Sequence, residues 1–284
     1  MKLCYTTWSM QKPPVDEMLA NLAEIGYDGV ELTVIPGWST ELDTLDRAER
    51  QRIRRLLDLY HLDLPSIAGH CQLLATDPDE HAENWRRLIG AIDLCVDLAG
   101  HTQPPVLDTT AGGKSDADWA GQHERLVDRL GRLCDYAAQR GVTVAIEPHV
   151  GNILETPART LELLHLVNRP NLKVYFDISH FNVQGIPIEE SVAALAPVSA
   201  ATHVKDERGI VPNFEFLIPG EGEFDYVRYL KAMHKAGWTK DITVEISLMV
   251  QRRANYDPWA AARQSYAILN GAFVEAGIPR DQRG

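Results

Sequence analysis

The chain alternates short apolar runs with longer segments in which apolar residues recur every three or four positions. The short runs are typical of buried strands, and the longer segments have the periodicity of helices that cover a core. The predicted strands are residues 2–8, 29–33, 64–70, 104–110, 143–147, 173–177, 200–203 and 242–245. The predicted helices are residues 15–25, 47–61, 79–99, a segment that follows Gly112-Gly113 and ends near Arg140, and then 157–167, 188–195, 226–236 and 258–276.

This strict alternation predicts the α/β class with a parallel sheet, because parallel strands need a crossover that is usually a helix. A (β/α)8 TIM barrel typically needs about 250 residues, and the chain has 284. We therefore expect a single TIM-barrel domain over residues 1–284. An open, doubly wound sheet is the rival fold, since alternation alone does not establish closure.

Composition and charge narrow the class of partner. A hydrophobic content of 45% with 24% charged residues is typical of a soluble globular enzyme. The formal net charge of -12 disfavours nucleic acid, since binding a phosphate backbone requires a positive surface. No stretch approaches the roughly 20 apolar residues that span a bilayer, and the first residues lack the features of a secretory signal. We expect a cytoplasmic protein with no membrane partner.

Four consecutive predicted strands in the second half of the chain end in a residue type that binds metal ions. These residues are Glu147, Asp177, His203 and Glu245. In a TIM barrel the carboxyl ends of the strands meet at one rim, where active sites lie. Three carboxylates and one imidazole favour one divalent metal, Mn²⁺ first, with Mg²⁺ or Co²⁺ as alternatives. The other interpretation is that each residue separately caps a helix or pairs with a basic side chain.

The chain resembles the xylose-isomerase-like barrels, and within them the sugar phosphate isomerase/epimerase group, across nearly its whole length. The resemblance rests on Ala145-Ile-Glu147-Pro, Phe176-Asp177-Ile-Ser-His180, His203-Val-Lys-Asp206, Pro219-Gly-Glu-Gly-Glu-Phe-Asp225 and Val244-Glu245-Ile. The ketose 3-epimerases of this group imply that the four residues above bind one metal and that Glu147 and Glu245 also move protons. Dehydratases share the family, so the resemblance does not name the substrate.

The activity implied is isomerisation or epimerisation of a keto sugar. A metal bound to the carbonyl and a neighbouring hydroxyl oxygen would stabilise the enediolate that forms when the adjacent carbon loses its proton. Two carboxylates, Glu147 and Glu245, would remove and return that proton. Because β-elimination begins with the same step, dehydration of a keto polyol stays open as an alternative. No Gly-rich, Lys-containing loop precedes a helix, which favours a substrate without phosphate.

His149 gives a further alternative, since it stands two residues after Glu147 and an imidazole can act as base or acid near neutral pH. This Glu-Pro-His arrangement resembles the barrel subunit of bacterial C-glycoside-cleaving enzymes. That resemblance implies a lyase that cleaves a 3-keto-glycoside by β-elimination, with His149 as base or acid and a small β-rich partner subunit. The other interpretation of His149 is a solvated loop residue.

Four more residues are predicted substrate contacts: His180, Arg208, His70 and Lys205. His180 lies one helical turn beyond Asp177, where the ketose epimerases carry a substrate-binding histidine, although it could instead bond locally in a first turn. Arg208 follows the metal histidine as in those enzymes, at a slightly different spacing. His70 and Lys205 lie at or just after strand ends. The family also implies a homo-oligomer, and no residue of the sequence specifies its symmetry.

Overall fold

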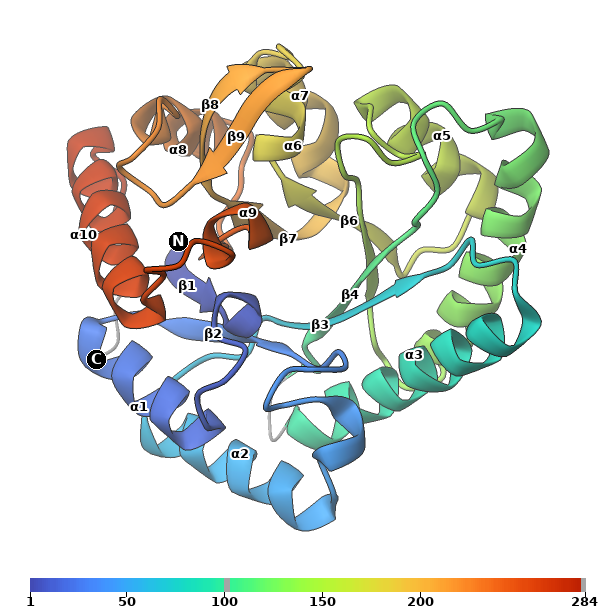
Figure 1. The fold of residues 1–284 in the computed structure, drawn as a ribbon, viewed down its shortest axis with the longest axis horizontal. Helices are drawn as coiled ribbons and strands as arrows, with labels where there is room; N and C mark the ends of the chain where they lie inside the picture. The colour runs from blue at the N-terminus through green and yellow to red at the C-terminus, as the bar shows by residue number, and fades with distance from the viewer. Residues whose placement is uncertain (100–102, 282–284) are drawn as a thin grey trace.

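A computed structural model describes residues 1–99 and 103–281, in which eight parallel strands form a closed barrel (Figure 1). The barrel strands are Lys2–Thr6 (β1), Gly29–Thr33 (β2), Ser66–Gln72 (β3), Val106–Thr110 (β4), Val144–Glu147 (β5), Leu172–Asp177 (β6), Ser199–Val204 (β7) and Asp241–Val244 (β10). β1 pairs with β2 on one side and with β10 on the other. This closure confirms the predicted TIM barrel and excludes the open sheet.

Helices form an outer ring around the strands (Figure 1). The helices of the ring are Val15–Ile25 (α1), Arg47–Leu59 (α2), Pro78–Leu98 (α3), Trp119–Ala138 (α4), Pro157–Val167 (α5), Ile188–Leu195 (α7), Tyr226–Lys235 (α8) and Pro258–Ala276 (α10). Two short helices, Ser179–Asn182 (α6) and Leu248–Gln251 (α9), follow β6 and β10. Several begin at an Asp or Thr whose side chain accepts a backbone N–H of the first turn, as Asp46 and Asp77 do. None of the helices in the described part of the chain combines the length and hydropathy needed to cross a membrane.

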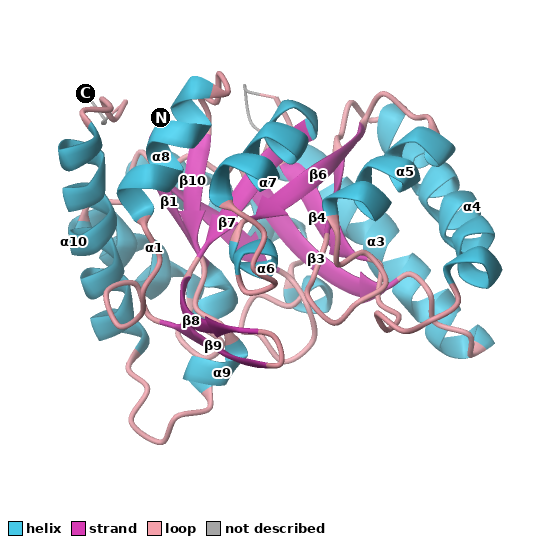
Figure 2. Cartoon of the chain, turned by 90° about the horizontal axis from the view of Figure 1, so that it is seen from above, coloured by secondary structure: helices cyan, strands magenta, loops and turns pink. Residues whose placement is uncertain are grey.

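The strands are buried on both faces, since the helices cover the outside and side chains fill the inside. Every residue of β2, β5 and β7 is buried. Parallel pairing brings the carboxyl ends of all eight strands to one end of the barrel. Figure 2 shows α9 and a separate two-stranded hairpin at that end, with the N-terminus at the opposite end.

That hairpin, Asp206–Ile210 (β8) and Asn213–Leu217 (β9), was not predicted. Its strands are antiparallel; β8 is largely polar, and Glu215 interrupts the apolar residues of β9, so neither strand has the continuous apolar run by which the barrel strands were recognised. Asp206 ties the hairpin to the loop that follows it. One carboxylate oxygen of Asp206 accepts the N–H of Gly220 and Gly222 at 2.7 and 3.0 Å, and the other accepts the N–H of Phe224 at 3.1 Å. A Cβ at Gly222 would clash with that carboxylate, so the loop requires glycine there.

Several predicted boundaries differ from the structure, most by one or two residues, and three of them have a local explanation. The first strand ends at Thr6, because Thr7–Ser9 turn into a 3₁₀ helix capped by the Thr6 hydroxyl. The third strand runs two residues later than predicted, since Gln72 still pairs with Thr110 of β4. α4 begins at Trp119 rather than directly after the two glycines, both of which have positive φ.

Candidate active site

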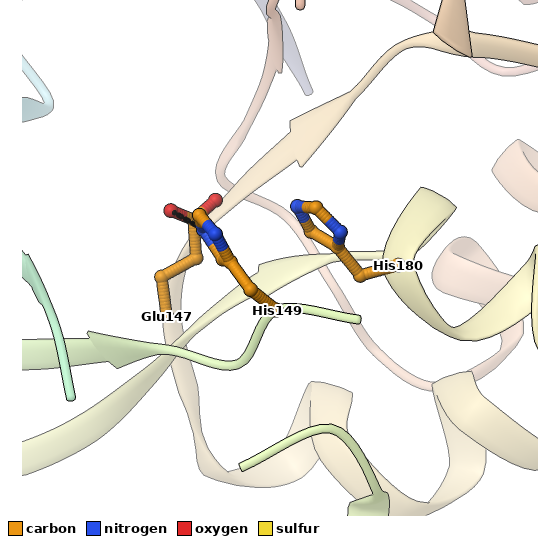
Figure 3. Close-up of side chains that lie close together, drawn as sticks. All are labelled: Glu147, His149 and His180. Atoms are coloured by element: carbon orange, nitrogen blue, oxygen red, sulfur yellow. Dashed lines mark hydrogen bonds and ion pairs between the residues drawn. The ribbon is translucent and has the colours of Figure 1, made fainter. Parts of the chain in front are cut away.

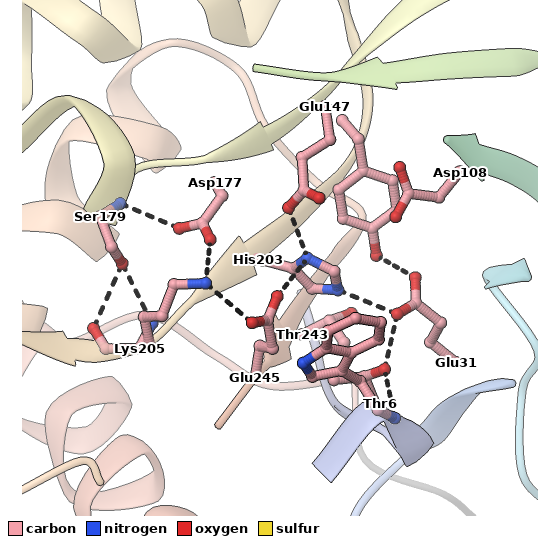
Figure 4. Close-up of polar contacts among 12 residues, drawn as sticks. Thr6, Glu31, Asp108, Glu147, Asp177, Ser179, His203, Lys205, Thr243 and Glu245 are labelled. Atoms are coloured by element: carbon pink, nitrogen blue, oxygen red, sulfur yellow. Dashed lines mark hydrogen bonds and ion pairs between the residues drawn. The ribbon is translucent and has the colours of Figure 1, made fainter. Parts of the chain in front are cut away.

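The four predicted metal ligands converge inside the carboxyl end of the barrel. One ligand atom from each of Glu147, Asp177, His203 and Glu245 lies within 4.8 Å of the others, and all four residues are buried. His203 Nδ1 is 3.0 Å from Glu147 Oε1 and 3.2 Å from Glu245 Oε2 (Figure 4). The register explains the convergence, because Asp177 and His203 are paired across β6 and β7, and Glu245 directly follows β10.

The donor set fits a divalent cation. Three buried carboxylates are costly to ionise unless positive charge balances them. The Lys205 ammonium supplies one such charge, since Nζ lies 2.6 Å from Asp177 Oδ2 and 2.9 Å from Glu245 Oε1 (Figure 4). One lysine does not balance three carboxylates, and oxygen-rich sets of this kind suit hard divalent ions.

The pKa values of His203 and Asp177 are set by burial and by the charges of neighbouring side chains. Burial lowers the pKa of His203, but the charge of Glu31 and the hydrogen bonds that the ring donates to Glu147 and Glu31 outweigh it and raise the pKa well above its ordinary value. Burial raises the pKa of Asp177, but the charge of the Lys205 ammonium outweighs it and brings the pKa to about 2. In the protein without metal, an ionised Asp177 therefore lies beside the Lys205 ammonium, and His203 is an imidazolium.

His149 and His180 form a stacked pair beside Glu147. His149 Nε2 is 2.6 Å from Glu147 Oε2, and Figure 3 shows the imidazole turned toward that carboxylate. The ring centroids of His149 and His180 are 4.3 Å apart with an interplanar angle of 19°. Burial and the charge of His149 lower the pKa of His180 well below its ordinary value, so this second imidazole is neutral. Phe216 of β9 meets His180 edge-on at 5.2 Å, which makes the hairpin part of the wall of the site.

His70 lies on the other side of Glu147, with Nε2 at 2.6 Å from Asp108 Oδ2 and 3.5 Å from Glu147 Oε2. Burial lowers the pKa of His70, but the charge and hydrogen bond of Asp108 outweigh it and raise the pKa to about 9. Burial raises the pKa of Asp108 to about 7. The Trp8 ring covers His70 at 5.2 Å and stacks on Trp38 at 4.9 Å, so aromatic side chains border this side of the site.

The predicted substrate contacts divide into two groups. Three of them contact predicted metal ligands: His70 contacts Glu147, and His180 and Lys205 contact Asp177. Arg208 lies apart from them on β8, with half of its side chain exposed. Its guanidinium donates to Glu215 Oε1 at 3.1 Å and to the Glu221 carbonyl at 2.5 Å, contacts that hold it along the hairpin and its following loop.

A polar layer beneath the four predicted ligands was not recognised from the sequence. Glu31 of β2 belongs to this layer: it is fully buried and faces His203 Nε2 at 3.0 Å. Burial raises the pKa of Glu31, but the charge and hydrogen bond of His203, with the Thr6 and Ser66 hydroxyls, lower it to about 2. The available signal was the presence of Thr6, Ser66 and Tyr175 inside otherwise apolar strands.

Fold and site together define a TIM-barrel enzyme with a carboxylate-rich centre at the carboxyl ends of its strands. The family model described as Xylose isomerase-like TIM barrel matches residues 19–269. The chain belongs to this family, which confirms the resemblance inferred from its motifs and the prediction that it is an enzyme.

The sequence identity to individual proteins is low, but the matches extend over most of the chain. L-ribulose 3-epimerase of Methylomonas sp. (strain DH-1) is 25% identical over 232 residues, which cover 80% of this chain and 76% of that protein. The 3-dehydroshikimate dehydratase of Bacillus anthracis is 28% identical over 209 residues, which cover 72% and 70%. The crystal structure of the IolI protein with a bound zinc atom superposes with a TM-score of 0.77 at 20% identity, over 97% of this chain and 98% of that one. This structural likeness concerns the fold alone.

Proposed function

We propose that the protein is a divalent-metal-dependent isomerase or epimerase that acts on a keto sugar. The convergence of Glu147, Asp177, His203 and Glu245 on one buried point carries this proposal. These four residues would hold one cation, Mn²⁺ first, with Mg²⁺ or Co²⁺ as alternatives. The zinc atom in IolI and the L-ribulose 3-epimerase among the relatives support it. When bound, the cation polarises the substrate carbonyl and stabilises the negative charge that develops on its oxygen.

Glu147 and Glu245 move the proton. In the barrel they belong to β5 and to the end of β10, with β6 and β7 between them, so their carboxylates reach the centre from two sides. One carboxylate takes the proton from the carbon next to the carbonyl. The other returns a proton to the opposite face of that carbon, which inverts its configuration, or to the neighbouring carbon, which moves the carbonyl.

Lys205 and His180 bind substrate oxygens in this proposal. The Lys205 ammonium lies between Asp177 and Glu245, where it keeps Asp177 ionised and can donate to a hydroxyl. His180 Nδ1 accepts the N–H of Val150 at 3.4 Å, so the neutral ring carries its proton on Nε2. That Nε2–H faces the ligand cluster and donates to the sugar. His70 binds the sugar from the other side of Glu147.

A second candidate function is favoured by the contact between His149 and Glu147. An imidazole here can remove the proton next to a ketone and then protonate a leaving group expelled from the β position. This reaction is C-deglycosylation of a 3-keto-glycoside, for which a small β-rich partner subunit is proposed, or dehydration of a keto polyol. The dehydratase among the relatives supports the elimination chemistry.

Proton NMR in D₂O with Mg²⁺-loaded protein separates these functions. The substrates are free ketoses, a 3-keto-glucoside with an aromatic aglycone and a cyclic keto polyol. The proposed function predicts deuterium at the carbon next to the carbonyl together with an epimeric or isomeric ketose. Release of the aglycone or loss of water, without exchange into free ketoses, would replace it with the elimination function. Mass measurement of the native protein tests the associated proposal of a homo-oligomer.

A further inference from the structure

We propose that Glu31 is a positioning residue that holds His203 in the orientation and tautomer in which Nδ1 binds the metal. The proposal rests on the proposed function only in its assignment of His203 as a metal ligand. It concerns the polar layer beneath the ligand cluster, where Thr6, Ser66 and Tyr175 surround Glu31.

The two nitrogens of His203 face different surroundings. Nδ1 points to the carboxylates of Glu147 and Glu245, and Nε2 points to Glu31 Oε1 at 3.0 Å (Figure 4). In the neutral ring, which is the form that binds a cation, the hydrogen bond to the Glu31 carboxylate keeps the remaining proton on Nε2. The lone pair of the neutral ring is then on Nδ1, directed at the place where the cation would lie.

Glu31 is itself held by hydroxyl groups from three strands. Oε1 accepts the Thr6 hydroxyl at 2.6 Å, and Oε2 accepts the hydroxyls of Ser66 and Tyr175, each at 2.7 Å. Together with the His203 ring these donors occupy both oxygens. Glu31, Asp108 and His203 also lie close enough to form a metal-binding group, but a carboxylate whose oxygens already accept four donors is suited to orient His203 rather than to bind an ion.

The face of the His203 ring is restrained as well. The Tyr175 ring lies 4.3 Å from it, and the same tyrosine donates its hydroxyl to Glu31. Tyr175 therefore restrains the imidazole plane through its ring and restrains Glu31, the hydrogen-bond partner of that imidazole, through its hydroxyl. Partners of metal-binding histidines that act in this way typically contribute about 10–100-fold to metal affinity.

The test measures Co²⁺ binding without substrate, by titration and by the visible d–d absorption of the bound ion. Glu31→Gln should weaken Co²⁺ binding by about 10–100-fold and change the d–d spectrum. Asp108→Asn is the matched control, because Asp108 is an equally buried carboxylate beside the cluster that bonds His70 rather than His203. It should leave affinity and spectrum close to those of the unaltered protein.

Unchanged affinity and spectrum in folded Glu31→Gln would overturn the proposal. An equal loss in Asp108→Asn would also overturn it, since the effect would then be a general one of buried charge. If Glu31→Gln does not fold, the same measurement is made on Tyr175→Phe, which removes one donor to Glu31. This variant should bind Co²⁺ several-fold more weakly, and an unchanged affinity would reject the proposal. Failure of the unaltered protein to bind Co²⁺ would reject the metal site itself, whereas bound Co²⁺ without sugar turnover would reject only the proposed reaction.

Discussion

Each carboxylate oxygen of Glu147 contacts the imidazole of a histidine. His203 lies at Oε1 and His149 at Oε2. A substitution of Glu147 therefore disturbs the metal site and the His149 contact together, so it cannot separate the two proposed reactions. His149 contacts Glu147 but is not one of the four predicted ligands. A substitution of His149 can therefore separate the two proposed reactions.

We expect His149→Ala to distinguish epimerisation from elimination. If this imidazole is the base or acid of an elimination, its loss should lower kcat by about 10²–10⁴-fold. An epimerase that uses two glutamates should lose less than about tenfold, the value expected when general acid–base catalysis is kept. Steady-state kcat and KM on the substrate that the NMR panel identifies provide the measurement.

Glu245→Gln tests the proton transfer that both reactions share. The amide keeps the shape of the side chain but cannot accept a proton, so turnover should fall by at least about 10²-fold. Glu245 also contacts Lys205, and the metal content of the variant should be measured beside its activity. A variant with full metal content and undiminished turnover would remove Glu245 from the mechanism.

At the scale of elements, the β8–β9 hairpin contributes Phe216 to the wall of the site and also carries the carboxylate of Glu207. Glu207 is buried, and Asn182 of α6 donates to its carboxylate at 2.5 Å. Burial raises the pKa of Glu207 to about 8. Since the ordinary value is 4.5, the folded protein binds one more proton than the unfolded chain between these pH values. Stability from this group is complete below the lower value and is lost as the pH rises through the higher one.

Glu207→Gln should therefore stabilise the protein at pH 9 and change little at pH 5. The neutral amide replaces a carboxylate that must ionise in a buried position, and we expect a gain of about 1–2 kcal/mol at the higher pH. For a chain of this size that gain corresponds to roughly 2–6 °C in Tm, which thermal unfolding at both pH values would measure. Glu215→Gln on the exposed part of the same hairpin is the control and should have no effect at either pH. A similar shift at both pH values would contradict the assigned pKa.

The barrel strands and the four converging residues could be predicted because both depend on local patterns. An apolar run ending in Glu147 or Asp177 identifies a buried strand and its terminal residue, and parallel closure then brings the strand ends together. The hairpin could not be predicted this way, because β8 is largely polar and β9 has no continuous apolar run, and the hairpin is held to the loop at 219–224 by hydrogen bonds from backbone N–H groups to the carboxylate of Asp206. The position of Glu31 depends on side-chain contacts between strands far apart in the sequence, which no local pattern encodes.

At the scale of the whole molecule, the proposed metal joins β5, β6, β7 and the end of β10, which form one half of the closed barrel. A ligand that binds only the folded protein stabilises it by RT ln(1 + [L]/Kd), about 2.7 kcal/mol at 100 times Kd. Adding Mn²⁺ at that excess after treatment with a chelator should raise Tm by roughly 5–10 °C. Asp177→Asn removes one of the four predicted ligands and should lose most of this shift. An equal shift in Asp177→Asn would mean that the ion binds elsewhere on the acidic surface, because a nonspecific site would not depend on a carboxylate buried at the end of β6.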